Sequence, residues 1–202
     1  MARRKAAADG LLERRAAVAR ILAGRGDALV VAGIGNAVHD VAACGDRPEN
    51  FYLAGVLGGA AMVGMGLALA QPARRVLVVT GDGEMLAGIG SLATIGVEKV
   101  ANLSIVVIDN CAYAATGMQA THTARGVDLA GIARASGFAR ARSAADEAGL
   151  RAVADEVFAV PGPCFAVLRV RSESGPRVAV PNDGTYTARR FRRALLGDAE
   201  TA

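Results

Sequence analysis

Two oxygen-bearing side chains, 28 positions apart, stand where buried strands are expected to end. Asp82 lies between two glycines directly after one apolar run, and Asn110 follows the next run. If a helix over residues 84–97 crosses between two parallel strands, both side chains reach the sheet edge where open α/β folds bind ligands. Asp82 alone is typical of a helix cap and Asn110 alone of a turn, but the pair at two strand ends is more specific.

A metal ion and an anion together explain why a carboxylate lies between Gly81 and Gly83. The glycines let the backbone approach a ligand closely, and a helix that starts at Glu84 offers free N–H groups to an anion. Asp82 would repel that anion unless a cation lay between them. A carboxylate, a carboxamide, a backbone carbonyl and phosphate oxygens suit octahedral Mg²⁺, so the sequence predicts a metal–phosphate site.

Other phosphate-binding and catalytic motifs fit poorly. Residues 33–38 (GIGNAV) and 81–86 (GDGEML) contain G-x-G, but both segments lack the third glycine of a dinucleotide fingerprint. The sequence has neither a G-x-x-x-x-G-K-[ST] loop nor a G-x-S-x-G nucleophile motif. Dinucleotide binding, Walker-type nucleotide binding and serine hydrolysis are therefore disfavoured.

Apolar runs alternate with helical stretches along the chain. The predicted strands are residues 28–34, 51–55, 75–81, 103–109, 138–142 and 164–170. The predicted helices are residues 4–22, 60–70, 84–97, 127–135, 144–159 and 186–196. The central runs are continuously apolar, as in strands that are covered on both faces. We expect an open, mainly parallel six-stranded α/β sheet with helices on both faces, in one domain over residues 1–202 with a helical arm at each end.

Composition and charge limit which cellular compartment and which classes of binding partner we expect. Hydrophobic residues make up 52% of the chain, and the net charge is +4 with arginines near both ends. No nucleic-acid-binding motif accompanies these arginines, so we interpret them as solvated faces of terminal helices. Three widely spaced cysteines are typical of free thiols in the cytoplasm. Residues 53–70 carry no charge, but their glycines favour a strand, a turn and a buried helix over a membrane span.

The Gly-Asp-Gly triplet followed by Asn110 resembles the signature of thiamine-diphosphate enzymes. Residues 50–60 (NFYLAGVLGGA) are similar to the Gly-x-hydrophobic-Gly turn that this family keeps upstream of the triplet. With SLATIG and IDNCAYAATGMQ, the pattern looks most like the β subunits of sulfopyruvate decarboxylase and like phosphonopyruvate decarboxylase. The resemblance implies a thiamine-diphosphate-binding fold and a lyase that releases CO₂ from a small 2-oxo acid.

The resemblance also implies which residues hold the charged end of the cofactor. Asp82, Asn110 and the backbone carbonyl of Ala112 would ligate Mg²⁺. The backbone N–H groups of Gly83 and Glu84 would hold the diphosphate at the start of the helix.

The same resemblance assigns the pyrimidine end to the upstream glycine turn. Leu57 would be the apolar wedge that bends the cofactor, and the carbonyl of Gly55 would accept a hydrogen bond from the 4′-amino group. From the residues alone, Leu57 is equally compatible with a core position. The neighbouring Gly58 and Gly59 favour close contact with a cofactor.

The family needs a glutamate that protonates the aminopyrimidine ring, and it carries that glutamate on a separate pyrimidine-binding domain. A chain of 202 residues suffices for the diphosphate-binding domain alone. Glu84 would face the diphosphate, and Glu49 and Glu98 are expected in exposed positions. We therefore expect a second polypeptide to supply the pyrimidine-binding domain, in a hetero-oligomer such as α2β2 or larger.

Two histidines are candidates for catalysis. His39 follows the first predicted strand, and His122 follows the segment that starts at Asn110. Either side chain would serve as a proton donor at the reacting carbon or bind a substrate carboxylate. A packed or surface histidine is an equally good reading of each.

Three further residues are candidates for the second anionic group of a substrate, namely Thr116, Gln119 and Arg125. Related decarboxylases tend to have TGGQ where this chain has Thr-Gly-Met-Gln. Met118 therefore replaces a glycine, and we expect its side chain to reshape the substrate pocket.

Three other functions remain open at this point. A 2-oxo acid:ferredoxin oxidoreductase β subunit shares the same triplet and asparagine, although three scattered cysteines build no Cys₄ cluster in this chain. A carboligase uses the same cofactor. A scaffold that holds the cofactor without turnover is the non-enzymatic alternative.

Overall fold

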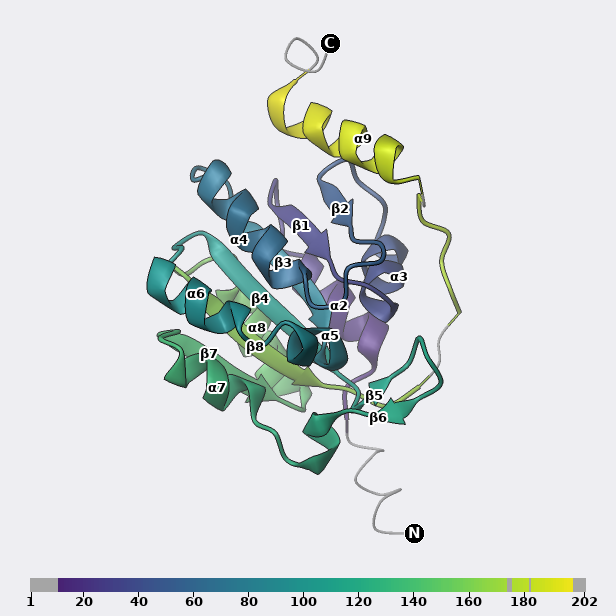
Figure 1. Ribbon diagram of the computed structural model, residues 1–202, viewed down its shortest axis with the longest axis vertical. Helices are drawn as coiled ribbons and strands as arrows, with labels where there is room; N and C mark the ends of the chain where they lie inside the picture. The colour runs from purple at the N-terminus through teal and green to yellow at the C-terminus, as the bar shows by residue number, and fades with distance from the viewer. Residues whose placement is uncertain (1–10, 174–175, 182, 198–202) are drawn as a thin grey trace.

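The computed structural model describes residues 11–173, 176–181 and 183–197 (Figure 1). These residues form an open sheet of six parallel strands in the order β2-β1-β3-β4-β8-β7. The strands are β1 (Leu29–Ala32), β2 (Asn50–Tyr52), β3 (Val76–Gly81), β4 (Leu103–Asp109), β7 (Arg140–Ala144) and β8 (Cys164–Arg169). Each strand overlaps one of the predicted apolar runs, so the predicted α/β sheet is confirmed.

Helices cover both faces of this sheet (Figure 1). One face is covered by α2 (Arg14–Leu22), α3 (Asn36–Ala43) and α8 (Glu147–Glu156). The other face is covered by α4 (Ala60–Ala70), α6 (Ser91–Glu98) and α7 (Leu129–Ala135). The remaining elements are α5 (Asp82–Ala87), the 3₁₀ helix η1 (His122–Arg125), α9 (Gly184–Leu196) and a hairpin of β5 (Ala112–Tyr113) and β6 (Gln119–Ala120).

Side chains of the central strands alternate between two apolar cores. In β1, Val30 and Ala32 join the core under α2 and α3, whereas Leu29 and Val31 join the core under α4. All four side chains are fully buried. Because both faces are covered, no position of the strand has to be polar, which explains the continuous apolar runs of the sequence.

The segment predicted as one crossover helix, residues 84–97, contains two helices instead. It holds most of α5 and α6, which separate at residues 88–90. A Cβ atom on Gly88 would overlap the carbonyl oxygen of Gly58, which itself has a φ of 89°. The glycine turn before α4 therefore packs directly on the end of α5, and this contact between distant segments accompanies the break.

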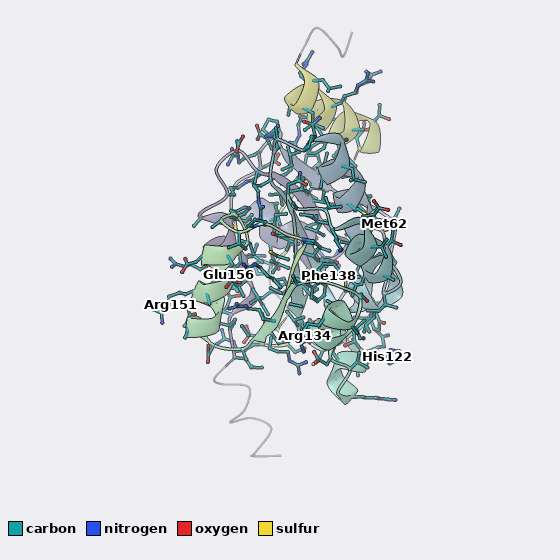
Figure 2. All side chains as sticks on the ribbon, turned by 90° about the vertical axis from the view of Figure 1, so that its left-hand side faces the viewer. Met62, His122, Arg134, Phe138, Arg151 and Glu156 are labelled. Carbon is teal, nitrogen blue, oxygen red and sulfur yellow. The ribbon has the colours of Figure 1, made fainter. Side chains whose placement is uncertain are left out.

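The uncharged segment at residues 53–70 forms a turn followed by α4. Small residues such as Ala60 and Ala68 face the sheet, while Met62, Val63 and Leu69 remain partly exposed on the outer side. Met62 lies at the outer surface in Figure 2. Among the described residues, no helix is long and apolar enough to cross a lipid bilayer.

The described terminal helices pack against the sheet domain through specific contacts. The predicted helix over residues 4–22 corresponds to α2, although its first seven positions lie outside the described residues. In α9, the ring of Phe191 lies 5.2 Å from that of Phe51, and Arg190 pairs with Asp46. Arg14 is only 6% exposed. The expectation that the terminal arginines only form solvated faces is therefore wrong for Arg14 and Arg190.

Candidate cofactor-binding site

A cavity of about 170 Å³ opens at the carboxyl ends of β1, β3 and β4. Its walls include residues 34–37 after β1, 81–84 after β3, and 108, 110 and 112–116 around the end of β4. Among the predicted site residues, the cavity is lined by Leu57, Gly81, Asp82, Gly83, Glu84, Asn110, Ala112 and Thr116. The two strand ends that the sequence singled out thus meet at one site.

Asp82 is held in place by two threonine hydroxyl groups that follow the hairpin in the chain. Asp82 is 1% exposed, and its Oδ2 accepts a hydrogen bond from Thr121 Oγ1 at 2.5 Å. Thr123 Oγ1 lies 3.2 Å from the same oxygen and 2.8 Å from Oδ1 of Asp109, so its single proton is shared between the two carboxylates. Burial raises the pKa of Asp82 to about 6; the hydrogen bond from Thr121 opposes this shift, and the charge of Asp109 adds to it. A bound cation would favour the ionised form of this carboxyl group.

Asn110 begins the reversal that forms the hairpin. Its Oδ1 accepts a hydrogen bond from the backbone N–H of Ala112 at 3.1 Å, and Cys111 takes up a φ of 61°. The backbone carbonyl of Cys111 then accepts a hydrogen bond from the N–H of Thr121 at 3.1 Å. This turn brings Thr121 back to the end of β3 and places Asn110 and Ala112 in the wall of the cavity.

The oxygen atoms at this site suit a Mg²⁺ ion that arrives with phosphate. Asp82 and Asn110 supply one carboxylate and one carboxamide to the same cavity. Nowhere in the described part of the chain do three His, Cys, Asp or Glu side chains gather into a metal-binding cluster. Because Mg²⁺ prefers six oxygen ligands, a donor set this small fits an ion that takes its other ligands from a diphosphate and water.

Gly83 has no room for a side chain. A Cβ atom at this position would overlap the ring of Tyr113 in the hairpin. The contact keeps the backbone after β3 close to the hairpin, and both residues line the cavity. Glycine at this position therefore lets the two cavity walls pack together and also lets a ligand approach the backbone.

The buried carboxyl group of Glu84 lies between Thr80 in β3 and Gly33 after β1. Thr80 Oγ1 donates a hydrogen bond to its Oε2 at 2.8 Å, and a Cβ atom on Gly33 would overlap the same carboxyl group. Burial raises the pKa of Glu84. The backbone N–H of Glu84, rather than its side chain, remains the group that would serve a diphosphate.

The glycine turn at residues 55–59 sets Leu57 at the mouth of the cavity. Gly55 and Gly58 have φ values of 78° and 89°, a region that favours glycine. Leu57 lines the cavity yet is 55% exposed, so it is not a core residue. Gly55 and Gly58 flank Leu57 without lining the cavity themselves.

Several predicted residues lie away from the cavity. His39 packs its ring against the chain near residue 178, where Nδ1 lies 2.8 Å from the Val178 carbonyl oxygen. His122 and Arg125 are exposed on η1, and Figure 2 shows His122 at the edge of the molecule. Among the described residues that line the cavity, none is His39, His122 or Arg125. The structure therefore gives no support to these three assignments.

The tip of the hairpin differs from the expected substrate pocket. Gln119 is exposed and exchanges hydrogen bonds with Thr116, whose Oγ1 donates to Oε1 at 2.9 Å. Met118 has a φ of 63° and an exposed side chain outside the cavity wall. Met118 therefore does not shape this cavity, and its expected effect on a substrate pocket stays a prediction. The left-handed backbone conformation of Met118 is one that favours glycine, the residue that related decarboxylases tend to have at this position.

Four residues that contribute to the site were not predicted from the sequence motifs. Arg14 and Asn36 line the cavity, and Thr121 and Thr123 hold Asp82. The threonines follow the Asn110 segment directly, so a hairpin prediction would have pointed to them. No local signal marks Arg14, since its burial depends on the packing of α2 on α3.

The fold and the cavity define an α/β protein with a cavity at the carboxyl ends of parallel strands, where open α/β folds bind ligands. Residues 33–168 match the family model of the thiamine pyrophosphate enzymes, described as their C-terminal TPP binding domain. The chain therefore belongs to the thiamine pyrophosphate enzymes and carries their diphosphate-binding domain.

Relatives extend the match over nearly the whole chain. The chain is 35% identical over 190 residues to the sulfopyruvate decarboxylase subunit beta of Methanothermobacter thermautotrophicus, covering 94% of this chain and 99% of that one. It is 37% identical over 181 residues to the phosphonopyruvate decarboxylase of Streptomyces viridochromogenes, covering 89% of this chain but 45% of the relative.

A solved structure shows the same fold at low sequence identity. The thiamine diphosphate-dependent 4-hydroxybenzoylformate decarboxylase of Rhodococcus jostii RHA1 superposes with a TM-score of 0.64 at 18% identity. The match covers 82% of this chain and 34% of that structure.

Proposed function

We propose that this chain is the diphosphate-binding, β-type subunit of a thiamine-diphosphate-dependent 2-oxo acid decarboxylase. The observation that carries the proposal is the meeting of Asp82, Gly83 and Asn110 in one cavity. The chain also aligns along almost its full length with a relative named as a decarboxylase subunit beta.

The charged end of the cofactor is assigned to this chain. Asp82, Asn110 and the backbone carbonyl of Ala112 would hold Mg²⁺, and the N–H groups of Gly83 and Glu84 would hold the diphosphate. The bound cofactor supplies a carbon nucleophile and an electron acceptor for the loss of CO₂. This chain's own contribution is to fix the cofactor and to exclude water from its charged end.

The pyrimidine end of the cofactor would be shared with another chain. Leu57 would support the bend of the cofactor, and the carbonyl of Gly55 would accept from its 4′-amino group. Glu84 is engaged with Thr80 and Glu49 pairs with Arg47, so we do not assign the activating glutamate to either residue. We assign that glutamate to a partner chain with a pyrimidine-binding domain, in a cytoplasmic hetero-oligomer such as α2β2.

The outer face of α4 is a suitable surface for this partner. Met62, Val63 and Leu69 are 39%, 38% and 52% exposed, and Val56 and Leu57, in the turn before α4, are each 55% exposed. A helix that is apolar on its solvent side indicates an interaction surface. The exposed Leu57 in the turn before this helix lines the cavity, which supports a partner that also covers the pyrimidine end of the cofactor.

The names of the relatives favour a 2-oxo acid with a second anionic group, such as sulfopyruvate or phosphonopyruvate. Of the three predicted substrate residues, Thr116 remains in the cavity wall. The substrate test compares kcat/KM for sulfopyruvate, phosphonopyruvate, pyruvate and a branched 2-oxo acid in this chain reconstituted with its partner.

We expect CO₂ release only when both chains are present, and a preference for the dianionic substrates. A preference of more than about tenfold for the uncharged side chains would remove the anionic-substrate assignment and leave the decarboxylase. An ordinary enzymatic rate with this chain alone would contradict the need for a partner.

A further inference from the structure

Arg14 brings a positive charge from the N-terminal helix to the cofactor cavity. It is the first residue of α2, and its side chain is 7% exposed. The same cavity is lined by Asp82, Gly83 and Asn110. Arg14 therefore reaches the wall of the proposed diphosphate site from an element outside the thiamine-diphosphate motif.

The guanidinium group of Arg14 is incompletely satisfied. Its Nη1 lies 3.3 Å from Oδ2 of Asp40 in α3, and neither atom makes a hydrogen bond with any described residue. Asp40 is fully buried, and its Oδ1 lies 3.4 Å from Nε of Arg15. One carboxylate thus serves two guanidinium groups. A buried guanidinium nitrogen without a hydrogen bond is costly, and an anion in the cavity would lower that cost.

The first turn of α3 adds backbone donors to the same wall. Asn36 and Ala37 line the cavity together with Arg14. The residue before this helix is Gly35, with a φ of 76°, and no side chain from the described residues caps the helix there. The N–H groups of the first turn are therefore open to a ligand, and a helix N-terminus favours an anion.

We propose that Arg14 binds the terminal phosphate of thiamine diphosphate, together with the first turn of α3. This inference rests on the proposed function, which places the diphosphate beside Asp82 and Gly83. The planar fork of a guanidinium group matches phosphate oxygens and binds them through charge-assisted hydrogen bonds. Asp40 acts as a positioning residue, because its carboxylate fixes the guanidinium group against α3.

Calorimetric titration of the full chain with inorganic pyrophosphate and Mg²⁺ tests the proposal without needing a pyrimidine-binding surface. Arg14→Gln should weaken pyrophosphate binding about tenfold to a hundredfold, the usual effect of losing charge-assisted hydrogen bonds. Arg14→Lys should fall between this variant and the wild type. Arg20→Gln, at an exposed position of the same helix, is the matched control and should bind as the wild type does.

A second variant keeps the test valid if the loss of Arg14 disturbs folding. Arg14→Gln combined with Asp40→Asn removes both charges of the buried pair, and circular dichroism reports whether it folds. The rise in Tm caused by pyrophosphate should be smaller in this variant than in the wild type.

Thiamine diphosphate is titrated in parallel, in the presence of the partner chain. If Arg14→Gln and Arg20→Gln bind pyrophosphate and thiamine diphosphate equally well, the role of Arg14 is wrong and the proposed function stands. If the wild type binds neither ligand, the proposed function fails, and the inference falls with it.

Discussion

The hydroxyl oxygen of Thr121 lies 2.5 Å from Oδ2 of Asp82, although the two residues are 39 positions apart. The hairpin after β4 returns the chain to the end of β3 and makes this contact possible. Thr123 donates to the same oxygen. Both threonine hydroxyls lie at Oδ2, and no described side chain donates a hydrogen bond to Oδ1. We therefore propose Oδ1 as the oxygen that binds the metal.

Thr121→Val should therefore weaken the metal site without removing a ligand. Losing a hydrogen bond that orients a metal ligand typically lowers metal affinity by roughly 10–100-fold. We expect that loss for Mg²⁺-dependent thiamine-diphosphate binding, measured by calorimetry. Thr94→Val, at an exposed position of α6, is the control and should leave the affinity unchanged. Equal Mg²⁺ dependence in both variants would rule out the orienting role of Thr121.

Gly83→Ala should separate the two walls of the cavity. The added methyl group overlaps the ring of Tyr113, and overpacking of this kind typically costs about 1–3 kcal/mol. We expect a lower free energy of unfolding and weaker cofactor binding, with recovery of stability when Tyr113→Ala is added. Gly81→Ala is the stability control, since no described atom lies within 4 Å of its added Cβ. A similar free energy of unfolding for both single variants would contradict the steric account.

The sheet was predictable because its strands are short apolar runs bounded by glycines and polar residues. The apolar runs around β3 and β4 placed Asp82 and Asn110 at strand ends, and the structure brings both to one cavity. The break between α5 and α6 was not predictable in the same way, because it accompanies a contact of Gly88 with Gly58 from a distant segment.

The hairpin and the buried arginine were missed for different physical reasons. β5 and β6 are two residues each, and the turn between them contains exposed residues without an apolar pattern. Arg14 looks like one more solvent-facing arginine in the sequence. Its burial results from the packing of α2 on α3, where Asp40 lies, and no local pattern reports that packing.

The apolar face of α4 should be required for assembly and not for folding. Met62→Glu combined with Val63→Lys places charges on positions that are partly exposed in the isolated chain. We expect loss of the complex with the partner chain, measured by light scattering after gel filtration, at an unchanged Tm of the isolated chain. Arg151→Glu, exposed on α8 across the sheet, is the control and should assemble normally. Normal assembly of the α4 variant would place the partner elsewhere.

Arg190 should fix α9 to the sheet through Asp46. Its two terminal nitrogens bind the two carboxylate oxygens at 2.5 and 3.1 Å. Partial burial raises the pKa of Asp46, but hydrogen bonds from Arg190 and Tyr52 outweigh this and hold the pKa below its ordinary value of 3.8. A lowered pKa in the folded state means that the pair stabilises the fold above pH 3.8 and loses this effect as the pH falls further.

Hydrogen exchange of α9 measures this docking. Arg190→Gln should speed amide exchange in α9 at neutral pH, and its difference in Tm from the wild type should shrink as the pH falls below 3.8. Arg189→Gln changes the same charge at an exposed position of the helix and is the control. Equal protection of α9 in the two variants would show that the ion pair does not fix the helix.

The most direct test of the account is calorimetric titration of thiamine diphosphate into the complex of this chain with its partner, with Mg²⁺ or with a chelator present. We expect binding by the wild type only with Mg²⁺, and loss of that binding in Asp82→Ala, because the remaining ligands cannot balance the charge of the diphosphate. Circular dichroism should show that the variant is folded. Undiminished affinity of a folded Asp82→Ala variant, or wild-type binding that is indifferent to Mg²⁺, would contradict the assignment of this chain as the metal–diphosphate subunit.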